Sequence, residues 1–348
     1  MSNAVAGVAR RGPQPVGAGA EGAGGGAPGA PSRPPRSCYH GRVSERDHIM
    51  LREARDILRG ELPGLEEAVP LAPLCAYGVG GPAELLYRAE TTGALAHAVR
   101  TAHGVGAPVT VLGRATNVLA GDAGLPGLTV LARNEAHTLD GDILMVEAGA
   151  ELPGLVAELA RQSLAGLEFA GNIPGSVGGA MVGNAGAYGR AVSDVLISVH
   201  LLDGTTEHVK EPRELDFGYR TSLFKRLPEL TVLSATFRLH RGERSALLDE
   251  IARDAARRRG KHPLEYASCG SYFKNPSREL PAARLIEDAG LKGFSVGAAR
   301  VSEKHANFLV ALPGATAADI VALAAEVRRR VREHSGHDLV EEVRRLGF

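Results

Sequence analysis

The fold of this chain depends on a glycine-rich stretch from Gly166 to Gly189, which reads GLEFAGNIPGSVGGAMVGNAGAYG. A second, shorter stretch from Leu112 to Asp122 reads LGRATNVLAGD. Several backbone N–H groups can approach a diphosphate closely only where no Cβ intervenes, and glycine also allows the positive φ of nest-like turns. The hydroxyls of Thr116 and Ser176 and the amide of Asn117 could add hydrogen bonds to such a ligand.

Tight turns alone would explain the shorter stretch, but the glycine density of Gly171–Gly189 favours a ligand. Neither stretch matches the dinucleotide fingerprint G-x-G-x-x-G or the phosphate loop G-x-x-x-x-G-K-[ST]. The pattern therefore predicts a phosphate-bearing ligand held by an unusual pair of loops, and leaves that ligand unnamed.

Helices and strands of ordinary length surround these stretches. The expected strands are 84–89, 108–112, 128–131, 144–148, 195–202, 206–209 and 230–239, with a loop over 113–127. The expected helices are 51–59, 94–102, 152–164, 245–259, 281–289 and a last one from a capping box at Thr316 and Asp319 to about His334. Because strands and helices mix without a regular βαβ repeat, the pattern predicts an α+β fold.

The composition excludes several classes of protein. The 40 Lys and Arg balance the 40 Asp and Glu, which argues against a nucleic-acid or membrane-surface partner. No apolar run is long enough to span a bilayer, and no signal peptide is evident. The cysteines Cys38, Cys75 and Cys269 have neither disulfide-framework nor metal-ligand spacing, so we expect a cytoplasmic protein without a metal site.

The N-terminal segment is different in composition from the rest. Residues Pro13 to Arg36 are mostly Gly, Ala and Pro, which cannot bury enough apolar surface to offset chain entropy. We therefore expect residues 1–49 to be a disordered tail. Met50 stands immediately before the helix-like run 51–59 and offers another start, so the segment is either a tail or untranslated sequence.

Specific motifs recur in a fixed order from Tyr77 to Gly347. They are YGVGGPA from Tyr77, the stretch from Gly113 to Asp122, the stretch from Ile173 to Gly189, YRTSLFK from Tyr219, GSYFKNP from Gly270, LIE from Leu285, VSEKHANF from Val301, and EVR from Glu342. Together they resemble the UDP-N-acetylenolpyruvoylglucosamine reductases. The short segments after Gly189 and Lys225 are similar to the type II branch, which lacks an extra substrate-covering loop.

The resemblance implies a fold and an activity. The fold is the FAD-binding fold of vanillyl-alcohol-oxidase (PCMH) type in two lobes, 50–133 and 134–240, the second joined by a C-terminal strand in 335–348. A smaller α+β substrate-binding domain would cover 241–334. The activity would be the reduction, with NADPH and non-covalent FAD, of the enolpyruvyl group of UDP-N-acetylglucosamine enolpyruvate to UDP-N-acetylmuramate, in peptidoglycan precursor synthesis.

Three residues carry the chemistry that the resemblance implies. The guanidinium of Arg220 can clamp a carboxylate and stabilise the developing enolate. The hydroxyl of Ser271 can protonate the carbanion. Glu342 can assist the enolate, most simply by a hydrogen bond if it is protonated in a shielded site. Taken alone, Arg220 could be a surface arginine and Ser271 a turn serine. We expect the adjacent Glu341 to be solvated.

The resemblance also assigns binding residues. Those expected to contact FAD are Tyr77, Gly113, Thr116, Asn117, Val118, Asp122, Gly175, Ser176, Gly178, Gly179, Asn184, Gly186, Tyr188 and Arg344. Those expected to contact the substrate are Tyr219, Lys261 and Asn275. The arginine run before Lys261 could equally be a solvated helix face, and we expect His305 to be structural.

Two other functions remain open from the sequence. One is a sugar or alcohol oxidase of the same superfamily, although the glycine stretches lack the His or Cys that often tethers flavin in those enzymes. The other is a nucleotide-sugar-binding regulator that has lost catalysis. The presence of Arg220, Ser271 and Glu342 argues against the regulator, and a purified protein without flavin colour would favour it.

Overall fold

The computed structural model describes residues 45–348 and their side chains from Arg52 onward. The first element is helix α1 (Glu45–Glu61). The expected tail therefore lies outside the described residues up to Ser44. For residues 45–49 that expectation is wrong, because these residues already form the first turns of α1.

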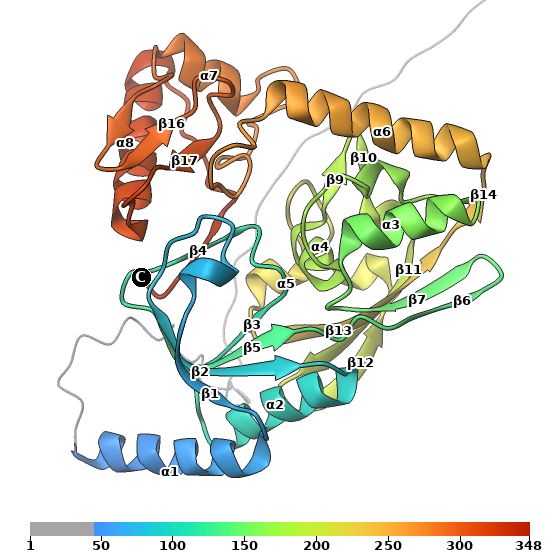
Figure 1. Ribbon diagram of the computed structural model, residues 1–348, viewed down its shortest axis with the longest axis vertical. Coiled ribbons are helices and arrows are strands. Elements are labelled where there is room, and N and C mark those ends of the chain that lie inside the picture. The colour runs from blue at the N-terminus through green and yellow to red at the C-terminus, as the bar shows by residue number, and fades with distance from the viewer. Residues whose placement is uncertain (1–44) are drawn as a thin grey trace, which may run out of the picture. The chain divides into compact units, whose positions relative to one another are not determined.

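The first sheet has the strand order β1-β2-β5-β3 and mixes antiparallel with parallel pairing. Its strands are β1 (Glu66–Pro70), β2 (Pro82–Ala89), β5 (Leu125–Ala132) and β3 (Val109–Leu112). Helix α2 (Thr92–Gly104) packs against β2 and β5 (Figure 1). It does so because Leu95, Ala98 and Val99 recur at helical spacing on its buried face.

The second sheet is antiparallel and has the order β12-β11-β13-β7-β6. Its strands are β12 (Thr206–Lys210), β11 (Leu196–Asp203), β13 (Leu230–Arg238), β7 (Ile143–Glu147) and β6 (His137–Asp140). Helices α3 (Leu152–Arg161), α4 (Val177–Gly183) and α5 (Leu223–Arg226) lie on one side of it (Figure 1). The apolar side chains of these helices, among them Leu155, Met181 and Phe224, form one core with the side chains on the facing side of the sheet.

The C-terminal part is a small α+β unit with its own core. Helices α7 (Ala282–Asp288) and α8 (Ala317–Ser335) pack with a three-stranded sheet of β15 (Ser295–Val296), β16 (Ala299–Val301) and β17 (Leu309–Ala311). The last strand, β18 (Arg344–Leu346), pairs in parallel with β4 (Val118–Ala120). The chain end thus returns to the shorter glycine stretch, 112–122, which contains β4.

Two packing relationships differ from the expected lobe boundaries. Helix α6 (Arg244–Lys261), expected in the range 241–334, packs on α3, and its Leu247 and Ile251 contact residues of the second sheet's part of the chain. The C-terminal strand pairs with β4, which lies within 50–133 and not within 134–240. Both contacts join residues far apart in the sequence, so local patterns contain no trace of them.

Most long elements agree with the expected ranges, and the capping box at Thr316 and Asp319 is present at the start of α8. Two expectations about loops are wrong, because the loop 113–127 contains β4 and the start of β5, and the glycine-rich stretch contains α4. The strand expected in 335–348 is present as β18. Strands β1, β6 and β15–β17 were missed because they are short and carry no clear alternation.

Among the described helices, none combines the length and the apolar character that crossing a membrane would require. Cys75 and Cys269 are buried free thiols.

Candidate active site

The two glycine stretches lie against each other. A Cβ at Gly113 would come within 2.0 Å of the Ser176 hydroxyl, so only glycine fits there. Beside this contact, the Thr116 hydroxyl donates a hydrogen bond of 3.0 Å to the carbonyl of Pro174. Residues 60 positions apart in sequence therefore form one continuous surface of backbone.

The turn after β3, residues 114–117, contains backbone N–H groups that are unpaired among the described residues. Among the described residues, the backbone N–H groups of Arg114, Ala115, Thr116 and Asn117 have no intramolecular partner. Ala115 has φ 46°, the left-handed value that turns successive N–H groups toward one side. Half-buried N–H groups without partners are costly unless a ligand or water accepts from them. This turn has the properties of an anion-binding site and fits a diphosphate.

The longer stretch is mostly ordered by its own hydrogen bonds, which corrects our expectation of loops. Ser176 caps α4 by accepting from the Gly179 N–H at 3.3 Å, and Gly178 donates to Ala148 at 2.8 Å. Asn184 ends α4 in the left-handed conformation, and its Nδ2 donates to the Gly218 carbonyl at 3.0 Å. Gly175 (φ 143°) stands beside the Thr116 hydroxyl.

A short hairpin completes the longer stretch. Strand β9 (Gly186–Ala187) pairs with β10 (Arg190–Ala191), and Tyr188 and Gly189 form the turn with positive φ. The Tyr188 side chain is 53% exposed, and the Arg257 guanidinium of α6 stacks over its ring at 5.3 Å.

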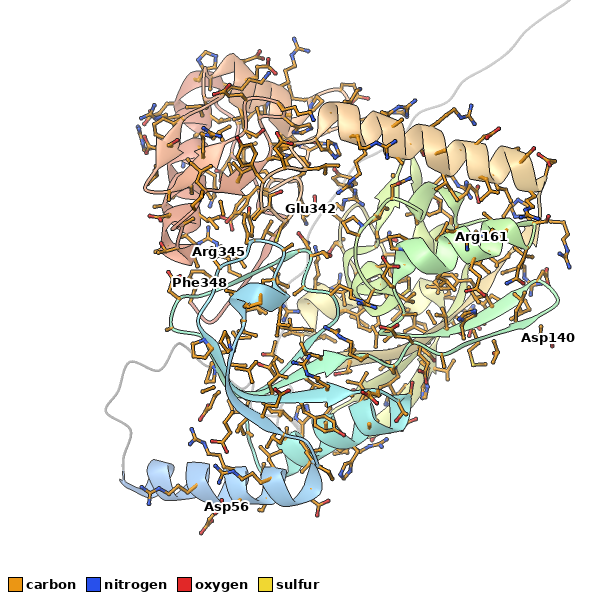
Figure 2. The ribbon with its side chains drawn as sticks, in the orientation of Figure 1. Asp56, Asp140, Arg161, Glu342, Arg345 and Phe348 are labelled. Atoms are coloured by element: carbon orange, nitrogen blue, oxygen red, sulfur yellow. The ribbon has the colours of Figure 1, made fainter. Side chains whose placement is uncertain are left out.

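Glu342 lies at the centre of the candidate site, on the last segment of the chain (Figure 2). Its N–H donates to the Tyr272 carbonyl at 2.8 Å, and its carbonyl accepts from Asn117 Nδ2 at 3.2 Å. Its carboxylate Oε1 is 3.0 Å from Arg220 Nε, and the Glu342 side chain is only 18% exposed. The shorter glycine stretch, the C-terminal segment and Arg220 thus meet at Glu342.

Arg220 is held in an uncommon conformation. Its φ is 53°, which non-glycine residues adopt rarely and which is typical of functional sites. Its Nη2 donates to the Gly186 carbonyl at 2.7 Å, and its own carbonyl accepts from Lys225 Nζ at 2.9 Å. Its buried Nε lies 3.0 Å from Glu342 Oε1 as an ion pair, without the geometry of a hydrogen bond.

The charges around Glu342 are strongly coupled. Burial raises the pKa of Glu342, while the positive charges of Arg220, Lys225 and Lys274 oppose that rise. Burial also lowers the pKa of Lys225, with Lys274 adding to the effect. Sequence reasoning missed these two lysines, although both lie in the motifs around Arg220 and Ser271. The sequence did contain a signal for them: both are positively charged residues close to Arg220, the candidate clamp for a carboxylate, or to Ser271.

Backbone contacts of its neighbours place Ser271 next to this cluster. It follows Gly270, whose φ is 80°, and precedes Tyr272, whose carbonyl accepts the Glu342 N–H. Phe273 forms a bridge with Glu341, so the segments 271–274 and 340–342 run side by side. Arg220, Ser271 and Glu342, widely separated in sequence, therefore come from three segments that converge.

Glu341 is not solvated, which corrects our expectation. Its side chain is 18% exposed, forms an ion pair with Arg345, and lies 3.5 Å from the Tyr272 hydroxyl. It points to different partners from those of Glu342, because neighbouring residues in extended backbone face opposite ways.

Four other residues expected at the cofactor have structural contacts. Tyr77 is buried in the C-terminal core, and burial holds its pKa well above the usual range. Both carboxylate oxygens of Asp122 accept backbone N–H groups, from Ala317 at 2.8 Å and Ala318 at 2.9 Å, and so cap α8. The Val118 carbonyl accepts from Cys269 Sγ at 3.3 Å. Arg344 donates its backbone N–H to Asn117 at 3.1 Å.

The expected substrate residues lie at the surface. Tyr219 is 59% exposed, Lys261 ends α6, and Asn275 accepts the Ala282 N–H at the start of α7. His305 packs against His262 and Phe308, and burial lowers the pKa of His305.

An open turn of unpaired N–H groups beside a shielded carboxylate, on this pair of sheets, defines an FAD-dependent oxidoreductase. A family model for an FAD binding domain matches residues 83–210. The C-terminal domain model of UDP-N-acetylenolpyruvoylglucosamine reductase matches residues 262–346. The chain belongs to the UDP-N-acetylenolpyruvoylglucosamine reductase family.

Individual relatives support this assignment. The UDP-N-acetylenolpyruvoylglucosamine reductase of Rubrobacter xylanophilus is 44% identical over 281 residues, which are 80% of this chain and 94% of the relative. That of Gloeobacter violaceus is 42% identical over 81% of this chain and 96% of its own length. The crystal structure of the Thermus caldophilus reductase superposes with a TM-score of 0.69 at 36% identity, covering 81% of this chain and 98% of that one.

Proposed function

We propose that this protein uses NADPH to reduce the enolpyruvyl group of UDP-N-acetylglucosamine enolpyruvate, giving UDP-N-acetylmuramate for peptidoglycan precursor synthesis. Family membership supports the reaction. The observation that carries the assignment of residues is the contact of Asn117 with Glu342, which joins the anion-binding turn to the carboxylate paired with Arg220.

The residues of the two glycine stretches fit FAD. The unpaired N–H groups of residues 114–117 would bind its diphosphate, and the missing Cβ at Gly113 leaves room for the Ser176 hydroxyl beside them. When bound, FAD would accept hydride from NADPH and deliver it to the terminal carbon of the enolpyruvyl double bond.

The protein's own residues handle the charge and the proton. Arg220 would hold the substrate carboxylate, and its fixed positive charge would stabilise the enolate as it forms. Glu342, whose pKa burial raises, would donate a hydrogen bond to the same oxygen atoms in its protonated form. Ser271 would transfer its hydroxyl proton to the carbon next to the carboxylate, since a carbanion is basic enough to accept it.

Binding of the nucleotide part of the substrate requires positively charged side chains and a planar side chain. Lys261, with the arginines before it on α6, would bind the diphosphate of UDP, and Tyr219 and Asn275 would contact the remainder. Burial lowers the pKa of Arg258 in this run, so this part of the run is not a fully solvated face. We assign this role to the C-terminal unit together with the end of α6.

One mixture tests the proposal. Purified protein, NADPH and the enolpyruvyl nucleotide sugar should consume NADPH in proportion to product, whereas NADPH without the sugar should be consumed only slowly. Omitting the sugar and supplying an alcohol in its place is the control for an oxidase. Turnover of the alcohol, or protein that purifies without flavin absorbance, would reject the assignment.

A further inference from the structure

The Arg220 guanidinium pairs with Glu342, lies 5.7 Å from the centre of the Tyr219 ring, and donates a hydrogen bond of 2.7 Å from Nη2 to the Gly186 carbonyl. Gly186 belongs to the β9–β10 hairpin, whose pairing consists of only two residue pairs, Arg190 with Ala187 and Ala191 with Gly186. An isolated hairpin of this size is not stable by itself. Backbone hydrogen bonds fix the neighbouring Ala185, whose N–H donates to the Ala180 carbonyl of α4 at 2.9 Å and whose carbonyl accepts the Val192 N–H at 2.9 Å. The position of the Gly186 carbonyl depends in addition on the side chains that anchor the other strand of the hairpin.

Arg190 is the strongest such anchor. Its Nη1 forms an ion pair with Glu168 Oε1, its Nη2 donates to the Gly166 carbonyl at 2.8 Å, and its guanidinium lies 4.8 Å from the centre of the Phe169 ring. The Glu168 side chain is only 9% exposed. At the tip of the hairpin, by contrast, Tyr188 is largely exposed and has the Arg257 guanidinium over its ring.

Glu168 is itself fixed in place. Its Oε2 accepts the Gly166 N–H at 2.6 Å, so both carboxylate oxygens are engaged. Burial opposes its ionisation, but the hydrogen bonds from Arg190 and Gly166 outweigh that effect and hold its pKa below the usual range. A fork of two parallel contacts from one planar guanidinium fixes both direction and distance, which lysine cannot reproduce.

The backbones of Arg190 and Gly186 are in direct contact, so the position of one constrains the position of the other. A Cβ at Gly186 would come within 2.4 Å of the Arg190 carbonyl oxygen, so the two backbones are in close contact. A shift of Arg190 must therefore move Gly186 and the carbonyl that Arg220 contacts.

We propose that the partly buried Arg190–Glu168 pair is a positioning pair for Arg220: it anchors the β9–β10 hairpin so that the Gly186 carbonyl holds the Arg220 guanidinium against Glu342. The proposal rests on the proposed function only for what Arg220 does once it is held. Neither Arg190 nor Glu168 touches the reacting atoms in this arrangement.

The first test is structural and independent of turnover. Arg190→Lys keeps the charge but cannot contact Glu168 and the Gly166 carbonyl together. A crystal structure of the FAD-bound variant should show the Arg220-to-Gly186 hydrogen bond broken or lengthened beyond 3.5 Å. Deuterium exchange at the Val192 amide, which donates to Ala185 across the hairpin base, should become faster. An unchanged Arg220 contact in the variant would overturn the proposal.

The second test is a double-mutant cycle on the half-reaction in which the enolpyruvyl substrate reoxidises reduced flavin. We expect Arg220→Lys to slow this step by roughly 10²–10³-fold and Arg190→Lys by about 10-fold, as for misplacement of a catalytic group. The double variant should be no slower than Arg220→Lys alone, because Arg190 acts through Arg220. Losses that multiply would mean that Arg190 acts on something else.

A matched control and a second variant complete the test. Arg100 also bridges a carboxylate and a carbonyl, those of Glu207 and Thr205, so Arg100→Lys should change neither half-reaction. If Arg190→Lys does not fold, Glu168→Gln keeps the side chain's size, and the same predictions apply to it. A broken Arg220 contact with normal reoxidation would support the positioning pair and reject the proposed role of Arg220.

Discussion

The two halves of the active site are built from different groups. The turn at residues 114–117 presents backbone N–H groups, and the Thr116 side chain beside them donates to a backbone carbonyl, that of Pro174. The cluster around Glu342 presents side chains, Arg220, Lys225 and Lys274, brought together by backbone contacts between distant segments.

This difference predicts that the two halves can be damaged separately. A change at the backbone turn should weaken cofactor binding, since a diphosphate depends on all of the N–H groups at once. A change in the charged cluster should leave the cofactor bound and slow the step in which charge develops. The predictions below test that separation, from the largest expected effect to the smallest.

Ser271→Ala should have the largest effect, and in one half-reaction only. The hydroxyl supplies the final proton, which flavin reduction by NADPH does not use. Stopped-flow absorbance should show normal reduction and a reoxidation by the enolpyruvyl substrate slowed by roughly 10²–10⁴-fold. Equal slowing of both steps would show that Ser271 maintains the shape of the site, and no slowing would place the proton donor elsewhere.

Glu342→Gln should change the pH dependence as well as the rate. Burial raises the Glu342 pKa, so the protonated form persists to higher pH than in an exposed glutamate. Reoxidation in the natural protein should fall as pH rises through that pKa. The neutral amide should be slower by roughly 10–100-fold, yet without the falling limb. A falling limb that persists in Glu342→Gln would assign it to another group.

Gly113→Ala tests the backbone half. The new Cβ would displace the Ser176 hydroxyl, which also caps α4. We expect FAD to bind about 10–100-fold more weakly in a fluorescence titration, because overpacking distorts the adjacent turn. Reoxidation of the FAD that remains bound should be nearly normal.

Gly183→Ala is the matched control, since a Cβ there meets nothing within 4 Å. It should leave FAD affinity unchanged and stabilise α4 by about 1 kcal/mol. Equal losses of affinity in the two variants would contradict our account of the turn.

Glu341→Gln should have the smallest effect. This carboxylate pairs with Arg345 and not with the cations around Glu342. Both half-reactions should stay within about threefold, while loss of a partly buried ion pair should lower the free energy of unfolding by about 1 kcal/mol. Denaturant unfolding and stopped-flow measurements report the two quantities. A loss of rate as large as that of Glu342→Gln would reverse the roles of these neighbours.

The sequence alone determined what depends on local chemistry. Helices α2, α3, α6 and α8 follow from apolar spacing and from the capping box at Thr316, and the phosphate-type ligand follows from glycine density. The motif order identified the family, and with it Arg220, Ser271 and Glu342 as candidates. Backbone propensity and side-chain chemistry act over a few residues, so a single sequence displays them directly.

Only the tertiary structure decided which of these groups meet. The order within the glycine-rich stretch, where α4 and a hairpin replace the expected loops, comes from hydrogen bonds such as that of Gly178 to Ala148. The different roles of Glu341 and Glu342 come from their partners Arg345 and Arg220, and the anchoring of Arg220 comes from Gly186. Such contacts join segments up to 225 positions apart, as between Asn117 and Glu342, and only packing of the whole chain selects them.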